Sequence, residues 1–75
     1  MIDVTVKLFA TFRAGRFDVE RRTLEAGTTV ADLVAALGIP KDEIGILLVR
    51  GRHADLGLVP AAGDTISIFP LVGGG

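Results

Sequence analysis

The sequence contains no cysteine, so it has no disulfide, no thiolate ligand for a metal and no thiol nucleophile. It also lacks an excess of basic charge, because eight lysines and arginines are balanced by nine aspartates and glutamates. This balance argues against the cationic surface that is typical of nucleic-acid-binding proteins. No apolar run approaches the ~20 residues of a membrane span, and the first residues show no signal-peptide pattern. We therefore expect a cytoplasmic protein with no nucleic-acid partner and no membrane partner.

A conventional active site is missing as well. His53 is the only histidine, and we interpret it as a surface residue near a turn. The carboxylates are scattered except for Asp42 and Glu43, whose adjacency is more typical of a solvated charge cluster than of an acid/base pair. No glycine-rich phosphate loop stands between a strand and a helix. The sequence therefore predicts no bound cofactor, no metal site and a chain that is not a catalyst by itself.

The sequence ends in three glycines, which have no side chains to pack into a core. Gly73, Gly74 and Gly75 are consecutive and follow Leu71 and Val72. Ordering each residue costs roughly 1–2 kcal/mol, so we expect 71–75 to form a flexible tail when the protein is free. Five extended residues reach about 17 Å, enough to carry a carboxylate into the active site of a partner. A frayed end without a function is the alternative.

The N-terminal third predicts two strands. Residues 2–9 alternate between apolar and polar, so the even positions are expected to face the core and Phe9 the opposite side. Residues 10–16 are expected to form a turn or short loop. The next strand, 17–24, alternates less well, and a bulge near Arg21-Arg22 would restore its pattern.

The middle of the chain predicts one amphipathic helix. Thr29 is a favoured N-cap, and Asp32 three positions later approximates a capping box. Gly38 is a good left-handed terminator of this helix. The expected buried stripe consists of Val30, Leu33, Val34 and Leu37.

The remaining elements are expected to be strands at 44–50, 52–54 and 65–69. This order predicts an α+β fold in which a mixed sheet of four to five strands wraps one main helix, the β-grasp arrangement of ubiquitin. Residues 1–70 would form this domain, followed by the tail.

The first and last strands are expected side by side at the centre of that sheet. Phe9 and Phe69 would then lie close together on the face that the helix leaves uncovered. Exposed aromatic residues on such a face suggest a docking patch for a partner. An ordinary, partly covered face is the alternative.

The carboxylate of Gly75 is the reactive group that remains. A carboxylate is a poor electrophile, but adenylation by ATP converts it into a mixed anhydride with a good leaving group. A sulfur nucleophile would then give a thiocarboxylate, whereas an amine would give an isopeptide bond. Both uses need a partner protein that activates the glycine end.

Four segments resemble the MoaD/ThiS family of ubiquitin-like sulfur carriers along the whole chain. They are residues 6–13 (VKLFATFR), residues 29–33 (TVADL), Gly63-Asp64 before the last strand, and the terminal Gly-Gly. The first segment and Phe69-Pro70 look like the molybdopterin branch of the family. The ending VGGG also looks like some carriers of the thiamine branch.

The resemblance implies that Gly75 carries the reactive carbonyl as adenylate and then thiocarboxylate. It implies that Gly73 and Gly74 supply a slender tail and that Leu71 and Val72 contact the partner. The implied partners are a ubiquitin-activating-like adenylyltransferase that uses ATP, a sulfur donor protein, and molybdopterin synthase large subunit as acceptor. A sulfur carrier for the thiamine thiazole, with thiazole synthase as acceptor, and a ubiquitin-like modifier conjugated to lysines are the alternatives.

Overall fold

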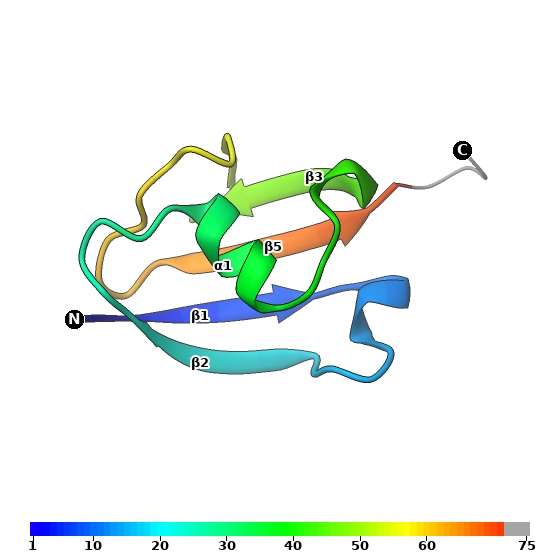
Figure 1. Cartoon of the computed structure of the whole chain (residues 1–75), viewed down its shortest axis with the longest axis horizontal. Coiled ribbons are helices and arrows are strands. Elements are labelled where there is room, and N and C mark those ends of the chain that lie inside the picture. The colour runs from blue at the N-terminus through cyan, green and yellow to red at the C-terminus, as the bar shows by residue number, and fades with distance from the viewer. Residues whose placement is uncertain (72–75) are drawn as a thin grey trace.

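A single mixed sheet lies against one short α-helix in the computed structural model, which describes residues 1–71 (Figure 1). Two 3-10 helices are also present, one after the first strand and one before the third. The strands are β1 (Ile2–Leu8), β2 (Val19–Leu24), β3 (Ile44–Val49), β4 (Arg52–His53) and β5 (Thr65–Pro70). The helices are η1 (Ala10–Arg13), α1 (Val30–Ala36) and η2 (Lys41–Glu43).

The sheet has five strands in the order β2-β1-β5-β3-β4. The central pair, β1 and β5, is parallel, and the other neighbours are antiparallel. Figure 1 shows α1 lying across one face of the sheet. The β-grasp prediction and the central position of the first and last strands are therefore confirmed.

The core lies between α1 and the sheet face that it covers. The even residues of β1 turn inward as predicted, because this strand has the helix on one side only. Of the predicted helix stripe, Leu37 is half-buried and the other three residues are buried. The buried apolar residues are Val4, Val6, Leu8, Phe12, Val30, Leu33, Val34, Ile39, Leu47, Val49, Ile66 and Ile68.

Both ends of α1 follow the predicted chemistry. The Asp32 N–H donates to the Thr29 hydroxyl at 3.1 Å, and the Thr29 N–H donates to the Asp32 carboxylate at 3.1 Å. This capping box satisfies two backbone groups that the helix cannot pair internally. At the other end, Gly38 has a φ of 73°, a left-handed conformation that glycine adopts without strain.

The segment after β1 differs from the sequence analysis in two details. Within the expected turn or short loop at 10–16, residues 10–13 form the 3-10 helix η1, and its Phe12 is buried in the core. The pairing of β2 with β1 runs without a break, so there is no bulge at Arg21-Arg22. Because β2 is an edge strand, its pattern is free to deviate: Val19 lies opposite Lys7 on the uncovered face and is 58% exposed.

Candidate functional site

The chain leaves the sheet at the end of β5, close to the start of β3 and to η1 (Figure 1). Pro70 is buried there, and Leu71 is 60% exposed. The Leu71 N–H donates to the Glu43 carbonyl at 2.9 Å, so the backbone is still held at residue 71. Leu71 thus lies where a partner can reach it. The other predicted tail residues, Val72, Gly73, Gly74 and Gly75, lie outside the described residues.

A bulge in β3 lies beside this exit. Ile46 is opposite Phe69 and Ile44 is opposite Pro70, so Gly45 is an extra residue in the ladder. A Cβ on Gly45 would lie 2.7 Å from the Pro70 carbonyl oxygen and 3.0 Å from the Leu71 Cα. Only glycine allows the two backbones to approach so closely. The sequence analysis missed this role, although a glycine within an apolar strand is itself a signal for a bulge or close approach.

Phe9 and Phe69 meet on the uncovered face of the sheet, as predicted. Their rings are stacked, with centroids 4.1 Å apart and planes inclined by 10°. The parallel register explains the contact: Leu8 pairs with Ile68, so the next residue of each chain segment points to the opposite face. Both rings are half-buried, and Ile46, which is 42% exposed, extends the apolar surface along β3. We call Phe9, Phe69 and Ile46 the aromatic patch.

Arg13, the last residue of the 6–13 segment, lies over the Phe9 ring at the border of this patch. Its guanidinium carbon lies 5.3 Å from the centroid of the Phe9 ring. Its Nε donates to the Leu8 carbonyl at 2.8 Å and lies 3.5 Å from the Asp18 carboxylate. Arg16 holds the same segment by donating to two carbonyls at the C-terminal end of α1, at 3.0 and 3.1 Å. The patch therefore has a cation fixed at its border.

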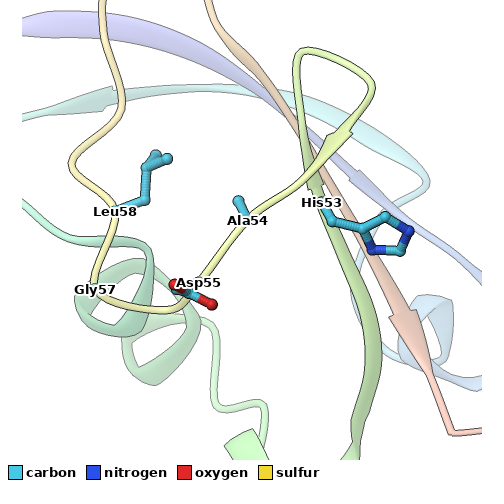
Figure 2. Close-up of a pocket in the computed structure, with 5 residues that line it drawn as sticks. All are labelled: His53, Ala54, Asp55, Gly57 and Leu58. Atoms are coloured by element: carbon cyan, nitrogen blue, oxygen red, sulfur yellow. The ribbon is translucent and has the colours of Figure 1, made fainter.

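His53 lies on the short strand β4. It lines an open hollow with Ala54, Asp55, Gly57 and Leu58, and Figure 2 shows its imidazole pointing away from Asp55 and Leu58.

Within residues 1–71, no group of three or more histidine, cysteine, aspartate or glutamate residues could hold a metal ion. In that same range, no helix has the length and apolar character to cross a membrane.

Comparison with known proteins gives a family and several solved relatives. The chain matches the family described as Mut7-C ubiquitin over residues 4–73. It is similar to small archaeal modifier protein 1 of Haloferax volcanii, with 30% identity and a TM-score of 0.77 over 96% of this chain and 100% of that one. The search of curated proteins finds no match.

Two further structures belong to molybdopterin-converting factors. A Pyrococcus furiosus protein assigned as subunit 1 of such a factor has 28% identity and a TM-score of 0.77, covering 96% of this chain and 100% of that one. The complex of subunits 1 and 2 from Helicobacter pylori has a chain with 21% identity and a TM-score of 0.65, covering 99% of this chain and 100% of that one. The last likeness shows the fold alone.

Proposed function

The chain belongs to the Mut7-C ubiquitin family, within the MoaD/ThiS group of ubiquitin-like proteins, and from this membership we propose that it is a sulfur carrier for molybdopterin synthesis. In this proposal the Gly75 carboxylate is adenylated and then becomes a thiocarboxylate. The observation that carries the proposal is the position of the aromatic patch beside the point where the chain leaves the sheet. A partner that binds this patch holds Leu71 at the entrance of its own active site.

The chemistry needs other proteins at each step. The Gly75 carboxylate attacks the α-phosphorus of ATP on a ubiquitin-activating-like adenylyltransferase, and pyrophosphate leaves. A hydrosulfide equivalent from a sulfur donor protein then attacks the acyl carbon, and AMP leaves. Because the chain has no cysteine, it has no side-chain thiol that could supply the transferred sulfur. The chain contributes the carboxylate and the surface that partners recognise.

The molybdopterin branch is supported by the Pyrococcus furiosus relative, which is assigned as subunit 1 of a molybdopterin converting factor. The Helicobacter pylori complex contains a protein of the same fold together with a second subunit. We propose a corresponding large subunit as the acceptor of sulfur, docked on the aromatic patch. Thiazole synthase is the alternative acceptor for the same thiocarboxylate.

A protein modifier is the second candidate function. It is favoured by the 30% identity with small archaeal modifier protein 1. The same activated carboxylate would then be attacked by a lysine amine of a target protein and would form an isopeptide bond. The two functions share the adenylation step and differ in the nucleophile that follows.

One experiment tests the carrier function and compares it with the modifier function. The purified chain is incubated with the adenylyltransferase of the same organism, ATP and a sulfide source, and its intact mass is measured. The sulfur carrier gains the difference between a sulfur and an oxygen atom, and a chain lacking Gly74 and Gly75 gains nothing. An unchanged mass with an active adenylyltransferase contradicts the carrier function. Higher-mass conjugates in cells, lost with the same deletion, would instead support the modifier.

A further inference from the structure

Gly45 has no side chain to offer a partner, yet it lies opposite the end of β5, where a Cβ on it would be 2.7 Å from the Pro70 carbonyl oxygen. We propose that Gly45 is a positioning residue for the reactive end: its bulge in β3 sets the residue at which the chain leaves the sheet. This inference rests on the proposed function, because it concerns the delivery of the Gly75 carboxylate. It adds a determinant within the fold that governs how far the tail extends.

The register shows what the bulge does. With Ile46 opposite Phe69, an unbroken antiparallel ladder would place Leu71 opposite Ile44. The bulge places Pro70 there instead, and the Leu71 N–H bonds to the carbonyl of Glu43. The hydrogen bond to the Glu43 carbonyl is thus made one residue earlier in the sequence than in an unbroken ladder. The bulge therefore leaves one additional residue of chain beyond this hydrogen bond, which is roughly 3.3 Å when extended.

The contact that requires glycine is made with backbone atoms of Pro70 and Leu71, which we call the exit segment. The three close neighbours of a Cβ at position 45 are the carbonyl oxygen and carbonyl carbon of Pro70 and the Cα of Leu71. A side chain could rotate away from such a contact, but these atoms belong to a backbone that is held on both sides. Pro70 is buried, and Leu71 is hydrogen-bonded to Glu43. A Cβ at position 45 must therefore displace the exit segment or remove the bulge.

Another glycine provides a matched control for this position. Gly57 lies in the loop after β4, a Cβ added to it would meet nothing within 4 Å beyond its chain neighbours, and its φ is outside the left-handed range. Gly45→Ala and Gly57→Ala are thus the same chemical change with and without contact to the exit segment. Both reduce the freedom of the unfolded chain in the same way, so a difference between them reports the contact.

The experiment measures kcat/KM for adenylation and thiocarboxylate formation with the cognate adenylyltransferase. Displacing a reacting group by about 1 Å costs up to about 100-fold, so we expect Gly45→Ala to lose about 10- to 100-fold and Gly57→Ala to stay within about twofold of wild type. Docking, measured by competition against wild type, should change little. Adding one glycine to the tail of Gly45→Ala should recover most of the lost rate, which a loss of stability alone would not allow.

Three results would overturn the inference: a wild-type rate for Gly45→Ala, a loss that the added glycine does not recover, or rapid hydrogen exchange of the Leu71 amide in wild type. If Gly45→Ala does not fold, wild type lacking one of its three terminal glycines replaces it, and full activity of that shorter chain contradicts the role of tail length. A wild-type chain that the adenylyltransferase does not activate contradicts the proposed function instead. In that case protection of the Leu71 amide, lost in Gly45→Ala, still tests the bulge.

Discussion

Replacing Phe9 by alanine separates the stability of the domain from its docking. Phe9 stacks on Phe69 with ring centroids 4.1 Å apart, and the guanidinium carbon of Arg13 lies 5.3 Å from the centroid of the Phe9 ring. An aromatic pair contributes about 0.5–1.5 kcal/mol beyond its buried area, and an exposed cation–π contact about 0.5–1 kcal/mol. Because Phe9 is half-buried, we expect Phe9→Ala to lower the free energy of unfolding by about 2 kcal/mol. A domain with the usual stability of about 5–15 kcal/mol stays folded after such a loss.

Phe9→Ala should remove a larger share of the binding free energy to a partner than of the free energy of unfolding. Buried aromatic anchors at the centre of an interface are the residues whose truncation costs about 2 kcal/mol or more. Since about 1.4 kcal/mol corresponds to a factor of ten, Phe9→Ala should weaken binding to the large subunit or the adenylyltransferase by about 30-fold or more. Isothermal titration gives the dissociation constant, and urea unfolding of the same samples gives the stability.

Val19→Ala is the control for this prediction. Val19 is an exposed apolar residue on the same uncovered face, but it lies on the edge strand β2, which β1 separates from β5. Its removal should leave binding within about twofold of wild type. If folded Phe9→Ala binds as tightly as wild type, or Val19→Ala weakens binding as strongly, the aromatic patch is not the docking surface.

Three further substitutions test what holds the site in place. Thr29→Ala removes the capping box of α1 and should cost about 1 kcal/mol, which a thermal melt would show as a decrease of about 4–8 °C. Asp64→Ala leaves the Ala61 N–H, now bonded at 2.8 Å, without its acceptor, and urea unfolding should show a stability lowered by about 1–3 kcal/mol. Arg16→Ala removes two hydrogen bonds to the end of α1 and should accelerate amide exchange in η1, with a loss of about 1 kcal/mol; unchanged exchange would contradict its role in holding that segment.

The parts of the fold that local chemistry determines could be predicted from the sequence. The alternation of β1 indicates which residues are buried because the strand has the helix on one face and no helix on the other. Thr29 and Asp32 predict the start of α1 because their hydrogen bonds span only three residues. The meeting of Phe9 and Phe69 followed from the expected strand order, which brings the ends of the first and last strands together.

The missed features depend on partners distant in the sequence or on non-repeating structure. Phe12 lies on a single 3-10 turn, which is too short to give a periodic pattern. The register of β2 is determined by its pairing with β1. Because β2 is an edge strand with no fully buried residue, its sequence lacks the apolar alternation that would indicate the register. A glycine within the apolar strand β3 is a signal for a bulge, but the backbone that Gly45 approaches belongs to the distant residues Pro70 and Leu71, so only the structure shows why glycine is required.

In the proposed function, strand topology places the docking surface beside the point where the chain leaves the sheet. Because β1 and β5 are parallel neighbours, their C-terminal ends lie at the same end of the sheet. The residue after β1 therefore lies beside the point where the chain leaves the sheet. A partner that binds the aromatic patch therefore also fixes the position of Leu71, whose N–H is bonded to the Glu43 carbonyl. From Leu71, four residues to Gly75 extend at most about 14 Å. The reacting atoms of every partner that uses this carboxylate must then lie within about 14 Å of the Leu71 position when the patch is bound, and a complex with a longer separation would require the chain to dissociate from the patch before it reacts.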